Sequence, residues 1–325
     1  MPLIGVVIIG RNEGERLIRC LQSINQYVSS TIYVDSASTD NSLEAAEKLG
    51  VHSLALDLST SFTAARARNI GFEELLKRYP ETEFVQFIDG DCEELDNWIE
   101  IAVDFLRANS QVAVVSGVLN ERFPEKSIYN TLCDLEWQMP IGEVKACGGN
   151  AMMRVSAFKA VNGFLPSLIA GEEPELCVRI RHAGWKIWHL NQLMMLHDAD
   201  MTTFKQWWKR TIRAGFAFAE GAYLHGAAPY YHWVAESERA RRWGLYIPLL
   251  AMMLFLIKPD MGTLLLLVYP LQWFRLVIKS ELPFKTAGLQ AGFFIIGKFA
   301  EVVGQFKFLW YRNKSKLVQH GFFIN

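Results

Sequence analysis

The first 120 residues of the chain alternate between apolar runs of strand length and segments with helical periodicity. The apolar runs are rich in valine and isoleucine, and they cover residues 3–9, 31–35, 51–56, 84–89 and 111–119. Runs of this kind, separated by helical segments, are typical of a parallel sheet that is covered by helices on both faces. The pattern therefore predicts an α/β fold with a Rossmann-like, mostly parallel central sheet and flanking helices.

A different pattern begins near residue 243, where charges become sparse. Two apolar runs, residues 245–257 and 261–278, are separated by the short sequence KPD. A membrane-spanning helix needs about 20 apolar residues, with a lower limit of about 17. Arginines precede the two runs and Lys279 follows them, so a hairpin of about residues 245–278 would return to its starting side and leave the N-terminal domain on the cytoplasmic face. A spanning hairpin and a re-entrant hairpin both satisfy this pattern.

A third apolar stretch, about residues 287–312, is interrupted by Lys298 and Glu301 and ends in basic residues. We expect it to form an amphipathic helix in the membrane interface. The alternative for all three stretches is a set of core helices, but tryptophan and tyrosine residues near the segment ends favour membrane association. The chain is therefore predicted to contain a domain of residues 1–225 and a membrane-associating helical region of residues 226–325.

Bulk composition excludes some classes of protein. The formal net charge is −1 and the isoelectric point is about 6.7, which gives no electrostatic footprint for binding nucleic acid. The five cysteines contain no CxxC pair and are odd in number, so we expect buried, reduced thiols in a cytosolic compartment. The apolar run at the N-terminus is too short for a signal peptide and is expected to be a strand.

The stretch FVQFIDGDCEELDNW (84–98) places a cluster of acids directly after a buried run. Crowded carboxylates repel one another unless a cation lies among them. The spacing of Asp89 and Asp91 lets both reach a hard divalent cation that prefers oxygen ligands, Mn²⁺ or Mg²⁺. The alternative is a simple turn at the end of a strand. A dinucleotide cofactor is not expected, because the first turn reads GRNEGE and lacks the GxGxxG sequence.

Six short sequences, in order along residues 4–220, resemble the family-2 glycosyltransferases, which have the GT-A fold. They are VIIGRNEGERL, VDSASTDNSLEAA, ARARNIGFE, FIDGD (the DxD motif), GGNAMMR and GEEPELCVRIRHAGW. The resemblance implies a GT-A catalytic domain followed by C-terminal hydrophobic helices. It also implies a site for a nucleotide sugar that includes Asn12, Glu13, Asp35, Arg66, Asn69, Asp89, Gly149 and Asn150.

Some of these residues also have a structural interpretation. Asp35 would accept a hydrogen bond from a uracil-like imide, or it would stabilise a turn in DSASTD, where Asp40 is expected to cap the next helix. Arg66 and Asn69 share one helix face, which points into the nucleotide site or into solvent. The glycines before Asn150 allow close approach of a ligand, or they only shape a bulge.

The resemblance assigns the remaining chemistry to residues later in the chain. Glu173 is expected to be the general base that takes the proton of the acceptor, with Glu172 as the alternative, whereas Glu175 is expected to be a first-turn acid. His197 would complete the metal site with Asp91 and Asp89, or it would be a structural histidine. The helical segment with Arg210, Arg213 and Trp207 would bind phosphate or the acceptor, or it would rest on anionic lipid.

The expected activity is that of a hexosyltransferase-like enzyme. It would move a sugar from a UDP- or GDP-sugar to a hydroxyl or phosphate of a lipid-linked or glycan acceptor, with inversion, in the biosynthesis of a cell-envelope polysaccharide or glycolipid. Its other expected partners are a divalent cation and membrane lipids. Two alternatives remain at this stage: a catalytically silent membrane scaffold that retains the fold, and a nucleotidyltransferase, which would need a glycine-rich basic loop after the first strand.

Overall fold

The computed structural model describes residues 4–57, 59, 62–95 and 97–319 of the chain. These residues form two compact units, Met1–Thr202 and Thr203–Asn325. The sequence analysis placed the division after residue 225, which is later in the chain than this boundary. Helix α8 (Phe204–His225) packs against α13 (Phe284–Gln319) and so belongs to the second unit.

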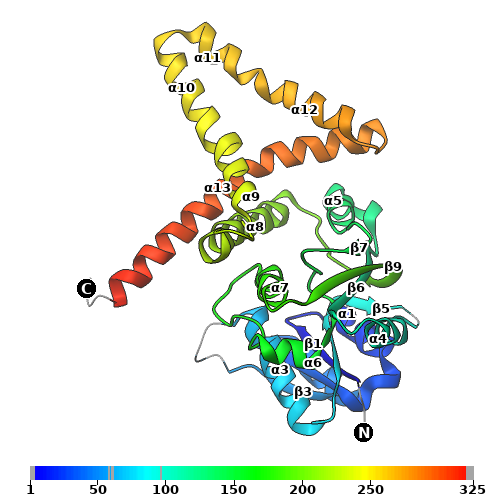
Figure 1. Ribbon diagram of the computed structural model, residues 1–325. Coiled ribbons are helices and arrows are strands. Elements are labelled where there is room, and N and C mark those ends of the chain that lie inside the picture. The colour runs from blue at the N-terminus through cyan, green and yellow to red at the C-terminus, as the bar shows by residue number, and fades with distance from the viewer. Residues whose placement is uncertain (1–3, 58, 60–61, 96, 320–325) are drawn as a thin grey trace. The chain divides into compact units, whose positions relative to one another are not determined.

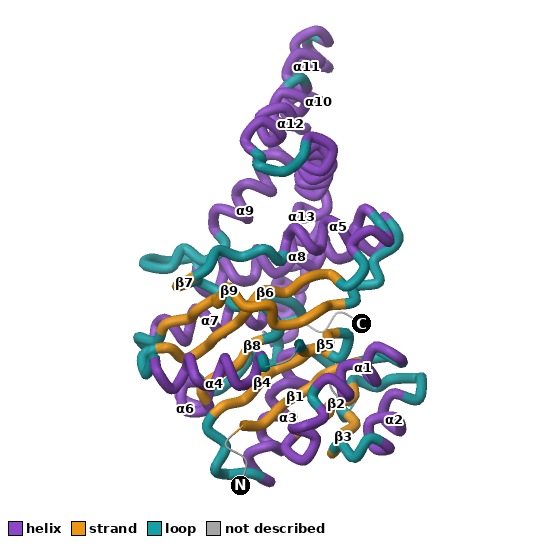
Figure 2. Tube along the Cα trace, turned by 90° about the vertical axis from the view of Figure 1, so that its right-hand side faces the viewer, coloured by secondary structure: helices purple, strands orange, loops and turns teal. Residues whose placement is uncertain are grey.

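The first unit is built on a mixed, nine-stranded sheet within the part of the chain that the structure describes (Figure 2). The strand order is β3-β2-β1-β4-β8-β6-β9-β5, and β7 pairs with β9. The bounds are β1 (Ile4–Gly10), β2 (Thr31–Asp35), β3 (His52–Ala55), β4 (Phe84–Asp89), β5 (Cys92–Glu94), β6 (Val112–Glu121), β7 (Gly142–Glu143), β8 (Ala151–Arg154) and β9 (Lys186–His197).

Strands β3, β2, β1 and β4 run parallel, as the apolar runs predict. The other half of the sheet is mixed: β6 and β9 are parallel, whereas β8 runs antiparallel to both β4 and β6. The expected α/β class is confirmed. The sequence did not reveal the antiparallel strands, because β5, β7 and β8 are too short to show a hydrophobic period.

Helices cover both faces of this sheet. Successive residues of β1 point to opposite faces, so Val7 and Ile9 pack in one hydrophobic cluster and Val6 and Ile8 in another. The first cluster includes residues of α3 (Ala64–Arg78), α6 (Val155–Ala160) and α7 (Glu172–His182), and the second includes residues of α1 (Glu15–Ser23), α2 (Ser42–Lys48) and α4 (Trp98–Ala108). The unit also contains α5 (Ile128–Glu136) and the 3₁₀ turns η1 (Asn25–Ser30) and η2 (Pro124–Lys126).

The second unit is helical. It consists of α8, α9 (Val234–Arg241), the π-helical turn η3 (Arg242–Tyr246), α10 (Ile247–Ile257), α11 (Pro259–Leu266), α12 (Val268–Lys279) and α13. Helices α8 and α13 approach closely at Gly215 and Gly304, where a Cβ atom would fall 2.1 Å from a backbone oxygen of the other helix. Figure 1 shows α10, α11 and α12, in yellow and orange, as an arm of this unit.

Three helical segments are long and apolar enough to cross a membrane: Val234–Ile257, Pro259–Lys279 and Phe284–Lys314. Side chains on the arm are strongly exposed, for example Leu256 at 79% and Ile257 at 82%. Exposed apolar surfaces of this kind fit association with a membrane. In α13, Lys298 and Glu301 are buried and paired with each other at 2.6 Å, so these two charges do not form a polar outer face. The interfacial placement of this helix stays a prediction.

Candidate functional site

Polar side chains gather where three neighbouring parallel strands of the first unit end. The strand register pairs Gly10 at the end of β1 with Asp35 at the end of β2, and Ile9 with Asp89 at the end of β4. The turns that follow these strands therefore begin at the same edge of the sheet. In open α/β sheets this edge is where ligands bind.

Arg68 is the buried cation of this edge. It lies on α3 and is only 2% exposed; its guanidinium lies 2.6 Å from Asp89 Oδ1 and 2.7 Å from Glu172 Oε1. Gly149 leaves room for this pair, because a Cβ atom there would lie 2.8 Å from Asp89 Oδ2. Asn150 accepts a hydrogen bond of 2.8 Å from the backbone N–H of Asp89. The structure thus brings Asp89, Glu172, Gly149 and Asn150 together around a residue that the sequence analysis did not assign.

The sequence did contain a signal for Arg68. On α3, the buried residues Arg68, Gly71, Phe72 and Leu75 follow the i, i+3, i+4, i+7 spacing of one helix face. An arginine on an apolar face of a helix is buried, and a buried arginine needs anionic partners. The residues proposed instead, Arg66 and Asn69, lie beside that face.

Asp91 and His197 lie close together near Asp89. Strand β5 pairs antiparallel with β9, and this register sets Cys92 opposite His197. The Nε2 atom of His197 lies 3.4 Å from Asp91 Oδ2, and the ring of Trp137 packs edge-on against the imidazole at 4.4 Å between centroids. The Nδ1 atom of His197 faces Glu121 Oε2 at 3.8 Å. Neither Glu121 nor Trp137 was identified from the sequence.

The electrostatics of this corner fit a divalent cation. Burial and the charge of Asp91 raise the pKa of Glu13 to about 7, and burial also raises the pKa of Asp91. Burial lowers the pKa of His197, but the carboxylates of Asp91 and Glu121 outweigh this effect and leave it raised. Carboxylate oxygens with one imidazole are donors that Mn²⁺ accepts, and a dication among them would stabilise their charged forms. Asp91, Cys92 and His197 place one donor atom each within 4.8 Å of one another.

Glu173 occupies the first turn of α7, after Gly171, whose φ of 76° lies in the left-handed region. Its Oε1 atom accepts hydrogen bonds from the backbone N–H groups of Cys147 (3.0 Å) and Gly148 (2.8 Å). Burial raises the pKa of Glu173 to about 7. Among the residues that the structure describes, none donates a hydrogen bond to Oε2. Glu173 therefore has a pKa near neutral pH, and its Oε2 atom accepts no hydrogen bond from the described residues.

The residues expected to bind the nucleotide have structural partners. Asp35 is 3% exposed and accepts hydrogen bonds from the Tyr33 hydroxyl (3.0 Å) and the Ser38 backbone N–H (2.8 Å). Asn12 Oδ1 accepts from the Thr39 backbone N–H at 2.7 Å. These bonds hold the loops after β1 and β2 together, and they leave the roles of Asp35 and Asn12 in nucleotide binding as predictions.

Two residues of α3 are also engaged. Asn69 exchanges hydrogen bonds with the backbone of Phe164, at 2.8 Å from its Nδ2 atom and 3.0 Å to its Oδ1 atom. Arg66 donates from Nη1 to the carbonyl oxygen of Asp57 at 2.7 Å. The two side chains thus have separate partners, and their joint role in nucleotide binding stays a prediction.

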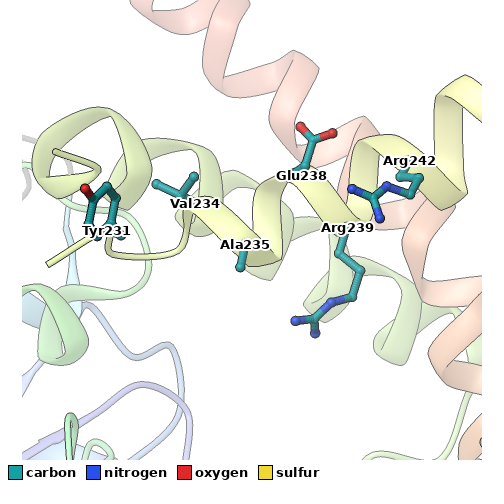
Figure 3. Close-up of a pocket in the computed structure, with 6 residues that line it drawn as sticks. All are labelled: Tyr231, Val234, Ala235, Glu238, Arg239 and Arg242. Carbon is teal, nitrogen blue, oxygen red and sulfur yellow. The ribbon is translucent and has the colours of Figure 1, made fainter. Parts of the chain in front are cut away.

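In the second unit, Trp207 is 7% exposed and packs edge-on against Phe293 at 4.8 Å, so this side chain belongs to the helical core. Arg213 is exposed and Arg210 is half-buried. A separate pocket lies along α9 and is drawn in Figure 3; it is lined by Tyr231, Val234, Ala235, Glu238, Arg239 and Arg242. The phosphate- or acceptor-binding role of Trp207, Arg210 and Arg213 stays a prediction.

Comparison with known proteins finds one family whose model matches part of the first unit. Residues 5–161 match the model of the family described as Glycosyl transferase family 2. No match was found among curated proteins.

Several solved structures are similar to this chain. The mannosyltransferase PcManGT from Pyrobaculum calidifontis, in complex with GDP-Man and Mn²⁺, is 18% identical, with a TM-score of 0.60 over 95% of this chain and 87% of that one. S. aureus TarS 1–349 in complex with UDP is 14% identical, with a TM-score of 0.48 over 96% and 91%. Glucosyl-3-phosphoglycerate synthase from Mycobacterium tuberculosis, with Mg²⁺ and UDP, is 18% identical, with a TM-score of 0.44 over 66% and 76%. Of these three structures, only PcManGT supports a shared fold, and this similarity confirms the expected GT-A-like arrangement.

Proposed function

Because residues 5–161 match the model of glycosyl transferase family 2, we propose that the protein transfers a sugar from a nucleoside-diphosphate sugar to an acceptor hydroxyl or phosphate with the help of a divalent cation. The observation that carries this proposal is the cluster at the strand ends. There, Asp91 and His197 lie beside Asp89, which Arg68 holds in place. The alternatives of a silent scaffold and a nucleotidyltransferase have no such specific support.

Asp91 and His197, with Glu13 nearby, are the residues that would hold the cation. Bound there, Mn²⁺ or Mg²⁺ would neutralise the diphosphate of the donor and of the departing nucleotide. The hard oxygens of Asp91 and Glu13 suit either ion. Asp89 is less suited to bind the metal directly, because Oδ1 is taken by Arg68; we propose that it positions the donor.

Arg68 fixes the geometry around the donor. Because the guanidinium is paired with both Asp89 and Glu172, it ties the end of β4 to the start of α7. Gly149 faces the same carboxylate, so the backbone between Cys147 and Asn150 can approach the sugar without a side chain intervening. This arrangement would fix the position of the donor relative to the proposed base.

Glu173 is the proposed general base. In a transfer with inversion, a carboxylate takes the acceptor proton while the acceptor oxygen attacks the anomeric carbon opposite the departing diphosphate. A pKa of about 7 suits this task at neutral pH, and Oε2 is free to receive the proton. Glu172 is the alternative, but its carboxylate is engaged with Arg68 at 2.7 Å, which suits a positioning role.

The acceptor is proposed to be lipid-linked or to lie at a membrane. The three apolar helical segments of the second unit support membrane association. With arginines before the arm and Lys279 after it, the positive-inside rule would place the catalytic domain on the cytoplasmic face.

The proposal is tested by offering purified full-length protein a panel of UDP- and GDP-sugars with Mn²⁺ or Mg²⁺. We expect one nucleotide class to raise the melting temperature, because a ligand that binds only the folded state stabilises it, and we expect slow metal-dependent hydrolysis of the matching sugar nucleotide. The absence of both effects across the panel would contradict the proposed function.

A further inference from the structure

Two buried cysteines lie against the proposed base. Cys177 follows Glu173 by four residues on α7, so the two share a helix face, and Cys147 comes from the loop before β8. Cys147 and Cys177 are 4% and 0% exposed. The chain's other cysteines fit the expectation of small buried hydrophobic residues, but this pair is set apart because both sulfur atoms contact the same carboxylate oxygen.

The three donor atoms form a small triangle. The Sγ atoms of Cys147 and Cys177 are 3.6 Å apart, and Glu173 Oε1 lies 3.7 Å from the first and 4.0 Å from the second. A tetrahedral zinc ion with Zn–S distances of about 2.3 Å and a Zn–O distance of about 2.1 Å requires S···S and S···O separations of about 3.8 and 3.6 Å. The observed triangle needs adjustments of only a few tenths of an ångström to become one face of that tetrahedron.

We propose that Cys147, Glu173 and Cys177 form a binding site for one soft divalent metal ion of the zinc class, separate from the hard-cation site at Asp91. Two thiolates select soft or borderline metals over Mg²⁺ and Mn²⁺. On binding, each thiol exchanges its S–H bond for an S–metal bond and releases its proton to solvent. The Glu173 carboxylate is the third ligand, and a water molecule completes the coordination.

The loop beside the site can admit an ion. Gly148 has a φ of +87°, is partly exposed, and would place a Cβ atom in open space. The hydrogen bonds from Cys147 and Gly148 to Oε1 close the loop over Glu173, so opening the loop would expose the three ligands together.

Occupancy of this site has a consequence that rests on the proposed function. A metal ion bound at Oε1 would lower the basicity of the whole carboxylate, so Oε2 would no longer accept the proton of the acceptor effectively. The zinc-class ion would therefore inhibit transfer, whereas Mn²⁺ or Mg²⁺ at Asp91 would support it.

The binding test uses full-length protein in detergent, freed of metal by a chelator, reduced, and supplied with excess Mg²⁺ to occupy the hard site. Cd²⁺ is titrated, and its thiolate charge-transfer absorption in the ultraviolet is recorded. We expect one Cd²⁺ per chain with this absorption, its loss in Cys177→Ser and in Cys147→Ser, and its retention in Cys133→Ser, a matched change of a buried cysteine on α5. Melting temperatures show that each variant is folded.

Two outcomes would overturn the metal site. One is the absence of the thiolate absorption in the wild-type protein. The other is absorption that survives in Cys177→Ser and is lost in Cys92→Ser, which would place the ion with Asp91 and His197 instead. The second readout is inhibition by Zn²⁺ of sugar-nucleotide hydrolysis, expected in wild type and relieved in Cys177→Ser. Cd²⁺ binding at the triad without inhibition by Zn²⁺ would retain the metal site and overturn the role of Glu173, so the two proposals fail separately.

Discussion

The guanidinium of Arg68 and the carboxylate of Asp89 form an ion pair of 2.6 Å at the edge of the sheet. The same guanidinium reaches Glu172 at 2.7 Å. One buried cation therefore joins the strand that leads into the proposed metal site to the helix that carries the proposed base. The relative positions of these two groups depend on Arg68.

Replacing Arg68 by methionine should destabilise the first unit. Removing the cation leaves Asp89 and Glu172 as facing, uncompensated carboxylates, at a cost of about 3 kcal/mol, the lower end of the range for a buried pair because the Asp89 side chain is 31% exposed. The melting temperature measures the effect. Arg66→Met is the matched control on the same helix and should cost far less; an equal loss in the two variants would contradict the account.

Glu173→Gln should lower kcat by about 100-fold to 10,000-fold, because it removes the group that accepts the proton while keeping the size of the side chain. KM for the donor should change little. Glu172→Gln should instead raise KM for the donor, since it loosens Arg68 and Asp89. Steady-state kinetics of transfer, or of hydrolysis when no acceptor is present, separates the two; the reverse pattern would make Glu172 the base.

The pH dependence of activity should report Glu173. A base must be deprotonated, and its pKa is raised by burial to about 7. We therefore expect kcat/KM to rise with pH through about 7 and then level off. An acidic limb centred near the ordinary glutamate value, or an unchanged limb in Glu173→Gln, would contradict the assignment.

The same group should affect stability with the opposite sign. Because the folded state holds the Glu173 proton more tightly than the unfolded state, where the pKa is about 4.5, this contribution is fully present below pH 4.5 and is lost as the pH rises through about 7. Its size is at most about 3 kcal/mol. Melting temperatures of metal-free wild type, relative to those of Glu173→Gln, should fall across this range; a difference that is independent of pH would contradict the prediction.

The exposed arm of the second unit should drive membrane binding. Leu256 is 79% exposed, so Leu256→Arg should leave the helix intact while weakening insertion by about 3 kcal/mol. Flotation with phospholipid vesicles measures this change. Leu256→Ala is the control and should float nearly as well as wild type; unchanged flotation of Leu256→Arg would show that α10 does not enter the membrane.

The sequence predicted the parts of the fold that long hydrophobic patterns specify. The runs at β1, β2 and β4 are continuous and apolar, and the parallel half of the sheet follows from them. The mixed half was missed because β5 has three residues and β7 two, too few for a period to be visible. Their positions are set by pairing with β9, which is a long-range contact.

The sequence predicted the acidic residues of the candidate site better than it predicted the residues that contact them. Asp89 and Asp91 stand out because they belong to a cluster of acids directly after an apolar run, whereas Glu173 was assigned by the family resemblance. The structure gathers Asp89 and Asp91 at the sheet edge with His197. Arg68 belongs to one of the sequences that resemble the family, but the sequence analysis gave it no role. Choosing between the faces of α3 requires knowing which face meets the sheet. Glu121 is far in sequence from His197, and Cys147 is far from Glu173 and Cys177, so only the fold reveals these contacts.

The central claim is that Asp91 holds a divalent cation against the diphosphate of the nucleotide. The most direct test is electron paramagnetic resonance of Mn²⁺ titrated into the full-length protein with UDP or GDP, for wild type and Asp91→Asn, with Asp40→Asn as a matched control. We predict that wild type and Asp40→Asn bind one Mn²⁺ in a nucleotide-dependent manner and that Asp91→Asn loses this binding. Equal, nucleotide-dependent Mn²⁺ binding in Asp91→Asn and wild type would contradict the claim.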